Sequence, residues 1–153
     1  MIDPIHRSIT VRRTREDAFR LFTAEMGSWW PLETHGRAGE LDGVKPERLV
    51  LEEAGGGRLY EVLSDGTEAD WGVVTAWEPP ARVVLDWNPS PEDRPYTEVE
   101  VTFTAVGDDT TRVELVHRHW ERLGEDAGAE YRAYYDPGWS YVFDDQFGEA
   151  AGR

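Results

Sequence analysis

The sequence predicts an α+β domain in which a curved antiparallel β-sheet wraps around a long C-terminal helix. Residues 97–103 and 112–117 alternate polar and apolar side chains without a fault, as strands with one buried face do. Between them, Gly-Asp-Asp at 107–109 predicts a hairpin turn. Apolar residues between 139 and 147 instead recur at helical spacing. Because a meander of hairpins has one apolar face to cover, we expect this helix to lie across it.

The N-terminal part of the chain is expected to form one strand and two short helices. Residues 5–11 alternate like a strand, and Thr14 is the expected N-cap of a helix whose apolar stripe lies within 18–22. A second helical turn is expected over 26–30, ended by the proline that follows. Residues 31–46 hold three glycines and two prolines, so we expect a loop there.

Further strands are expected in the middle of the chain, which gives about six or seven in all. Turn-forming sequences separate them, namely Gly-Gly-Gly, Ser-Asp-Gly and a Pro-Pro pair. The expected strands are 48–53, 58–63, 69–78 and 82–88, and a proline-rich loop follows over 89–95. The C-terminal helix is expected to begin at Asp136, because an N-cap followed by proline is a typical helix start. Residues 125–135 are interpreted as a separate helical piece.

Composition bounds the functions that the chain can have. Its 153 residues suit one domain, 1–153, and the absence of cysteine excludes disulfides and thiolate zinc sites. The formal net charge of −15 gives no support to binding of nucleic acids or anionic membranes. Without a leader or a membrane-spanning apolar run, we expect a cytoplasmic location. The acidic residues are interpreted as a solvated surface, with a cationic partner as the alternative.

A set of motifs in a fixed order resembles a known family. The motifs are Phe22-Thr23, Trp29-Trp30-Pro31-Leu32, Thr34-His35, Gly56-Gly57-Arg58-Leu59-Tyr60-Glu61, Trp71-Gly72-Val73-Val74, Trp77-Glu78-Pro79-Pro80, Arg82, Asp86-Trp87, Thr97 to Phe103, Leu115-Val116-His117, Trp120-Glu121 and Gly138-Trp139. Together, over roughly residues 5–148, they resemble the homologues of the Hsp90 ATPase activator's C-terminal domain, within the START-like (SRPBCC) superfamily.

The resemblance implies a helix-grip fold with a hydrophobic cavity, often as a lone bacterial domain of unassigned activity. Superfamily relatives bind lipids, hormones or polyketides, and a few catalyse cyclisation or hydrolysis, so the fold does not select among these functions. The chain departs from the pattern at His119, where relatives commonly carry a small residue such as glycine.

Two residues are candidates for acid–base chemistry. His117 is expected to face the cavity as a hydrogen-bond donor or general base, or else to be a buried imidazole bonded to the helix or a loop. Glu61 faces inward in one phase of its strand, where burial would raise its pKa. The alternatives are an ion pair with Arg82, or the opposite phase, in which Tyr60 takes the inner position.

Aromatic residues are the main candidates for ligand contacts, with core packing as the alternative for each. The predicted ligand-binding residues are Trp30, Tyr60, Trp71, Trp87, His117, Trp120 and Trp139. His117, His119 and His35 would together suit a metal, but no acidic–histidine spacing supports such a site. We therefore expect no metal and no cofactor. No nucleophile motif or phosphate-binding glycine loop is present in the sequence.

Three functions follow as hypotheses. The first is binding of a small hydrophobic or aromatic molecule between sheet and helix, with loops 31–46 and 88–95 as gates. The second is a cyclase, dehydratase or hydrolase that uses His117 and Glu61 as an acid–base pair. The third is a protein-interaction module similar to the Hsp90 activator, with a protein partner or a homodimer as its assembly. The sequence leaves the ligand, any reaction and the oligomeric state open.

Overall fold

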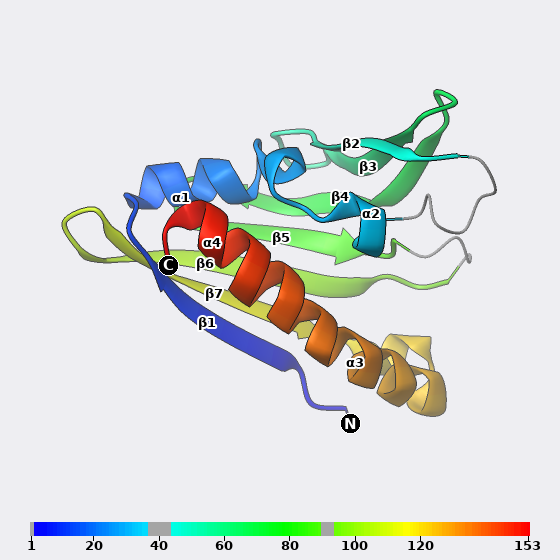
Figure 1. The fold of residues 1–153 in the computed structure, drawn as a ribbon. Helices are drawn as coiled ribbons and strands as arrows, with labels where there is room; N and C mark the ends of the chain where they lie inside the picture. The colour runs from blue at the N-terminus through cyan, green and yellow to red at the C-terminus, as the bar shows by residue number, and fades with distance from the viewer. Residues whose placement is uncertain (1, 37–43, 90–93) are drawn as a thin grey trace.

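A computed structural model describes residues 2–36, 44–89 and 94–153 and confirms the α+β helix-grip prediction. Seven strands form one antiparallel sheet in the order β1-β7-β6-β5-β4-β3-β2. Figure 1 shows this sheet curling around a long C-terminal helix that crosses its concave side. The strands are β1 (Ile5–Val11), β2 (Pro46–Leu51), β3 (Arg58–Leu63), β4 (Glu68–Glu78), β5 (Arg82–Trp87), β6 (Thr97–Gly107) and β7 (Thr110–Arg118). Consecutive hairpins build β2 to β7, and β1 closes the far edge against β7.

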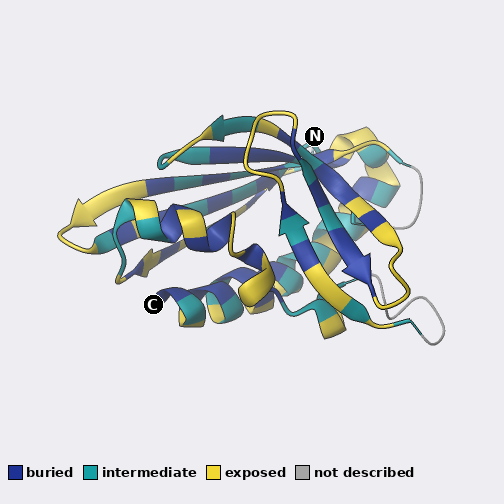
Figure 2. Cartoon of the chain, turned by 90° about the horizontal axis from the view of Figure 1, so that it is seen from above, coloured by how far each residue is buried: buried dark blue, intermediate teal, exposed yellow. Residues whose placement is uncertain are grey.

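β1 and β3 have the predicted bounds, and the other strands differ from the prediction by a few residues at one or both ends. β6 and β7 both extend beyond the faultless alternation, to the turn at 107–109. Val99, Val101 and Phe103 of β6 face inward as expected, and their partners on β7 are His117, Leu115 and Val113. Figure 2 shows buried residues along the strands and exposed residues at the β6–β7 tip.

The C-terminal helix corrects one prediction, because it begins at Glu125 rather than Asp136. α3 (Glu125–Trp139), a π-helical stretch η4 (Ser140–Phe147) and α4 (Gly148–Ala151) follow one another without a break. Pro137 therefore lies inside the helix, where it cannot donate a backbone hydrogen bond. Its position is exposed, so water can satisfy the carbonyl that proline leaves unpaired. Asp136 is not a cap, since its carboxylate pairs with Arg7 of β1.

Short helices connect β1 to the rest of the sheet. They are α1 (Arg15–Phe22), the 3-10 turn η1 (Met26–Ser28) and α2 (Leu32–His35); a further 3-10 turn, η3 (Trp120–Leu123), precedes α3. α2 corrects the prediction of a loop over 31–46, because the chain re-forms a helical turn directly after Pro31. Proline is compatible with a helix start even where it ends the preceding turn. The rest of that predicted loop, 37–43, lies outside the described residues, as does 90–93.

The core lies between the concave face of the sheet and the C-terminal half of the helix. Phe22 of α1 packs edge-on against Phe103 of β6 and Phe147 of η4, with ring centroids 6.1 and 5.2 Å apart. Phe143 stacks on Phe147 at 5.6 Å. No helix in the three described ranges is both long and apolar enough to cross a membrane.

The predicted N-cap of α1 is confirmed, because the Thr14 hydroxyl accepts a hydrogen bond from the Asp17 backbone N–H at 3.1 Å. We expect Thr14→Ala to lower the free energy of unfolding by about 0.5–2 kcal/mol, since this donor then loses its partner. Thr14→Ser keeps the oxygen and should retain most of the stability. Urea denaturation of the three proteins measures the difference. Equal stability of the alanine variant and the wild type would contradict a stabilising cap.

Candidate functional site

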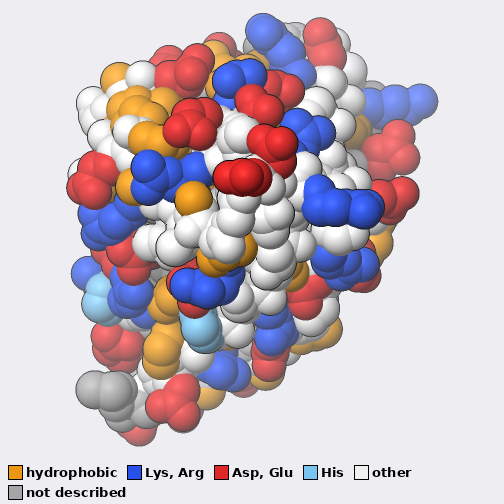
Figure 3. Space-filling model, turned by 90° about the vertical axis from the view of Figure 1, so that its left-hand side faces the viewer, with side chains coloured by type: hydrophobic (Ala, Val, Ile, Leu, Met, Phe, Trp, Pro, Cys, Tyr) orange, Lys and Arg blue, Asp and Glu red, His pale blue; other side chains and the backbone are white. Residues whose placement is uncertain are grey.

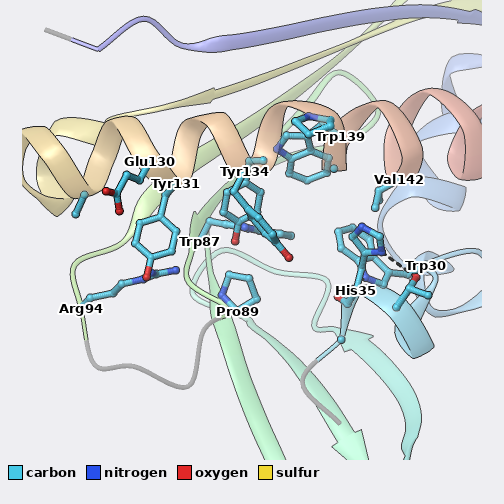
Figure 4. Close-up of a pocket in the computed structure, with 16 residues that line it drawn as sticks. Trp30, His35, Trp87, Pro89, Arg94, Glu130, Tyr131, Tyr134, Trp139 and Val142 are labelled. Atoms are coloured by element: carbon cyan, nitrogen blue, oxygen red, sulfur yellow. Dashed lines mark hydrogen bonds between the residues drawn. The ribbon is translucent and has the colours of Figure 1, made fainter. Parts of the chain in front are cut away.

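A cavity of about 960 Å³ opens beside the N-terminal half of the long helix. Figure 4 shows α3 along one side of it, with Trp87, Pro89 and Arg94 opposite and His35 and Trp30 at one end. From α3, the residues that line it share one helical face: Ala127, Glu130, Tyr131, Tyr134 and Gly138, joined by Tyr135, Pro137 and Trp139. The cavity therefore lies between the helix and the ends of β5 and α2.

Three tryptophans form the wall between this cavity and the core. The ring centroids of Trp30, Trp87 and Trp139 are 5.8, 6.0 and 5.5 Å apart, which makes a closed triangle. All three rings line the cavity. The sequence named these residues as ligand contacts, and that contact stays a prediction. Trp71 packs behind them at 5.2 Å from Trp30 and is fully buried. Indole rings thus fill the space between sheet and helix next to the cavity.

His117 lies behind the tryptophan wall rather than in the lining, and its ring is fully buried. Trp139 Nε1–H donates to His117 Nδ1 at 3.0 Å, so the ring proton sits on Nε2, which is 2.7 Å from Thr97 Oγ1. The Thr97 hydroxyl in turn donates to the Trp87 carbonyl at 3.2 Å. Burial holds the pKa of His117 well below its usual value of 6.5. His117 is therefore a neutral imidazole with both nitrogens bonded, which matches the alternative that the sequence left open.

Trp120 and Tyr60, the remaining predicted contact residues, also lie outside the cavity lining. Trp120 is fully buried, its ring 4.0 Å from that of His117, and its Nε1–H donates to the His117 carbonyl at 3.0 Å. Tyr60 is on the opposite face of the sheet, where the guanidinium of Arg58 lies 4.1 Å from its ring centroid. These two residues stabilise the walls and the outer surface of the sheet.

Glu61, rather than Tyr60, faces the interior, and its carboxylate is fully buried. Its Oε1 accepts from Trp71 Nε1–H at 3.2 Å. The alternative partner, Arg82, lies on the outer face and bonds Glu78 and Glu100. β4, β5 and β6 separate the strands of Glu61 and His117, a path of about 19 Å across the sheet at the usual strand spacing. The two groups proposed as an acid–base pair are thus not brought together.

The tyrosines of α3 were predicted as packing residues of a separate helical piece over 125–135, and not as part of a cavity lining. Tyr131, Tyr134 and Gly138 recur at helical spacing, but the expected break before Pro137 kept this face from being read as one surface with Trp139. Tyr134 is 71% exposed, which is unusual for a large aromatic side chain. Arg94 was missed too, and nothing in its local sequence pattern indicates a role.

The polar side chains that line the cavity include one cation, one carboxylate and several neutral rings. Arg94 lies over the Tyr131 ring at 3.9 Å, and its Nε donates to Asn88 Oδ1 at 3.1 Å. Burial raises the pKa of Tyr135 to about 12, which keeps its phenol neutral. Burial also lowers the pKa of His35, whose ring stacks on Tyr141 at 5.1 Å. At neutral pH the lining thus combines a cationic Arg94 with neutral phenol and imidazole groups and an exposed carboxylate, Glu130.

The backbone conformation at His119 accounts for the small residue that relatives commonly carry at this position. Its backbone φ is 73°, in the left-handed region that favours glycine. Its ring lies between carboxylates, 3.7 Å from Glu98 and 3.4 Å from Glu121. Within the described ranges, no group of three or more His, Cys, Asp or Glu residues is arranged to hold a metal ion.

Comparison with known proteins assigns the family. The family described as "Activator of Hsp90 ATPase homolog 1-like protein" matches residues 12–152. The chain belongs to this family. A search of curated proteins gives no match. Among solved structures, the Hsp90-activator-homologue chain is 31% identical to Txn09, an anthrahydroquino-γ-pyrone synthase complexed with SUM, over 97% of this chain and 96% of that chain, with a TM-score of 0.62.

Other solved structures share the fold of this chain. CalC, a self-sacrificing resistance protein from Micromonospora echinospora, is 27% identical over 97% of this chain and 93% of its own, with a TM-score of 0.67. The Aha1 dimer from Colwellia psychrerythraea is 16% identical over 98% of this chain and 96% of its own, with a TM-score of 0.63. The likeness to the Aha1 dimer concerns the fold alone.

Proposed function

We propose that the protein binds a small planar aromatic or hydrophobic molecule in the cavity beside α3, without converting it. The observation that carries this proposal is the volume and lining of that cavity. About 960 Å³ lies at the upper end of the range for small-molecule sites, and three indole and three phenol rings line it. Aromatic rings offer large apolar contact areas and stacking geometry to a flat ligand.

The comparisons support this class of ligand. Txn09 is named as the synthase of an anthrahydroquino-γ-pyrone and was solved complexed with SUM. Since this relative is 31% identical over nearly the whole chain, a fused aromatic compound is a reasonable first class to test. A reaction that uses His117 and Glu61 as an acid–base pair receives no support from the geometry. Both ring nitrogens of His117 are hydrogen-bonded, to Trp139 and Thr97, and three strands separate His117 from Glu61.

An interaction module like the Hsp90 activator ranks lower. Such a module needs an exposed apolar patch larger than those of ordinary monomers. On the face shown in Figure 3, acidic and basic side chains are interleaved and hydrophobic groups form small separate patches. Among described residues, the large hydrophobic side chains that are exposed are Tyr96, Val106, Tyr134 and Tyr141. Tyr134 belongs to the cavity lining, so its exposure is explained by the binder proposal.

Thermal unfolding with anthraquinones, flavonoids, steroids and fatty acids tests the proposal, together with native mass spectrometry of the purified protein. A planar aromatic compound at about 100 times its Kd should stabilise the fold by about 2.7 kcal/mol, or roughly 5–10 °C in Tm. Fatty acids should shift Tm less, because they cannot stack on the indole wall.

A matched pair of variants assigns the shift to this cavity. Gly138 lines it, and a Cβ built there meets no heavy atom within 4 Å, so Gly138→Trp should fill the space and abolish the shift. Ala129→Trp adds the same ring to an exposed position of α3 outside the lining and should leave the shift intact. If no compound stabilises the wild type, or if Gly138→Trp binds as well as wild type, the proposal is wrong.

A further inference from the structure

We propose that the cavity binds its ligand through a negatively charged oxygen, such as a phenolate or carboxylate, which Arg94, Trp87 and Tyr135 hold at the end away from His35. This inference rests on the proposed binding function and adds the chemical class of the ligand's polar group. Figure 4 places Arg94 and Trp87 on the same side of the cavity, facing α3. Both residues, with Tyr135, also line a narrow gap that lies beside the cavity next to Thr97 and Trp120.

Two donors at this end have no hydrogen-bond partner among the described residues. They are the Trp87 Nε1–H and the Arg94 Nη1, and both atoms are buried. The Trp87 N–H lies near enough to the Tyr135 hydroxyl to offset part of its pKa rise, but it forms no hydrogen bond of normal geometry with it. Buried donors in folded proteins are nearly always paired, so two unpaired donors on residues that line the cavity indicate that a ligand acceptor belongs at this end of it, once a small side-chain movement uncovers them.

The charge of Arg94 sets the sign of the expected ligand group. Its other contacts are the Tyr131 ring and the amide oxygen of Asn88, both uncharged. Glu130 is the carboxylate of the described lining, and it is exposed at the rim. Among the residues that the structure describes, Arg94 has no ion-pair partner, and a partly buried guanidinium in this state binds an anionic oxygen more strongly than a neutral one. Tyr135 adds a donor that stays protonated, because burial raises its pKa to about 12.

The positive charge of Arg94 contrasts with the negative charge of the protein as a whole. With a formal net charge of −15, the protein surface repels anions in general. An anion that binds this protein well therefore needs a specific cationic site, and Arg94 provides one within the aromatic lining. The ring system would stack on the tryptophan wall while the oxygen faces Arg94 and Trp87.

Two probes with one ring system separate this anchor from aromatic binding as such. They are 8-anilino-1-naphthalenesulfonate, which is anionic, and N-phenyl-1-naphthylamine, which lacks the sulfonate. We expect both to bind the wild type, and we expect Arg94→Gln to raise the Kd of the sulfonate about tenfold while changing that of the neutral probe less than twofold. Titration calorimetry or probe emission gives both constants. Gly138→Trp should weaken both probes together.

Control variants keep the result interpretable. Arg48→Gln removes the same charge from an exposed position of β2 outside the lining and should leave both Kd values unchanged. Trp87→Phe keeps a ring in the wall but removes the N–H, so it should weaken the sulfonate alone by a few-fold. If Arg94→Gln changes both probes equally, or neither, the anchor is refuted while aromatic binding stands. If neither probe binds the wild-type cavity, the proposed function itself fails.

Discussion

Replacing Gly72 with alanine is expected to prevent the sheet from forming. A Cβ at Gly72 would lie 1.8 Å from the backbone oxygen of Asp86 and 2.9 Å from its carbonyl carbon. Gly72 is paired with Trp87 in the β4–β5 ladder and with Leu59 of β3, so it lies between two strands that cannot both move away. We expect a loss of more than about 4 kcal/mol, seen as absent cooperative unfolding in circular dichroism.

The matched control is Gly138→Ala, since a Cβ there meets no heavy atom within 4 Å. In a helix interior, alanine should raise the free energy of unfolding by up to about 1 kcal/mol. Two glycine-to-alanine changes are thus expected to act in opposite directions. A Gly72→Ala protein as stable as the wild type would mean that β4 and β5 separate easily, and that the position of the Trp87 ring is not fixed by this close approach.

Replacing His117 with leucine should produce the second-largest effect. The change leaves Trp139 Nε1–H without its acceptor and removes one of the two hydrogen bonds of the Thr97 hydroxyl, which still donates to the Trp87 carbonyl. A buried group left unpaired costs about 1–3 kcal/mol and a lost hydrogen bond about 0.5–1.5 kcal/mol, so the expected loss is about 1.5–4.5 kcal/mol, or roughly 3–18 °C in Tm. His117→Gln keeps one donor and one acceptor and should lose less. Calorimetry of the three proteins, at one pH above 7, measures the order.

The same histidine should make stability depend on pH. Burial holds the pKa of His117 well below 6.5 in the folded protein, while the unfolded chain takes up a proton near 6.5. The stabilising contribution is therefore fully present above that pH. As pH falls below 6.5, the free energy of unfolding should fall by about 1.4 kcal/mol per pH unit until the folded pKa is reached.

His35, whose pKa is also lowered, acts in the same direction, so the test is the difference between wild type and His117→Gln. Denaturant unfolding at pH 7.5, 6.5 and 5.5 should show a steeper loss for the wild type. Parallel curves for the two proteins would show that His117 becomes protonated without unfolding.

The strands could be predicted from the sequence because their alternation is local. β1 and β3 have the predicted bounds, and the inward positions of β6 follow from a two-residue period. The start of the helix could not be found in the same way. Asp136 followed by Pro137 has the pattern of an N-cap, but in the structure Asp136 pairs with Arg7 of β1, a contact across 129 residues that no local pattern reveals.

The candidate site was predictable only where residues belong to a regular pattern. Trp30, Trp87 and Trp139 were named as ligand contacts; the structure places them in the cavity lining, and their contact with a ligand stays a prediction. His117 was placed inside by alternation, but its bonds to Thr97 and Trp139 depend on how β6, β7 and the helix meet. Arg94 lies in an irregular segment, where no periodicity indicates which way a side chain points.

The two halves of the long helix differ in how many of their side chains are buried in the core. α3 buries only Gly128 and Trp139, whereas η4 buries Val142, Phe143 and Phe147 in the core. Substitutions at the exposed tyrosine face of α3 are therefore expected to change folding less than substitutions at the buried residues of η4. One helix thus combines a surface that can change its contacts with a segment that holds the fold. In a protein of this fold, the ligand preference can then be altered on the first half of the helix without altering the core.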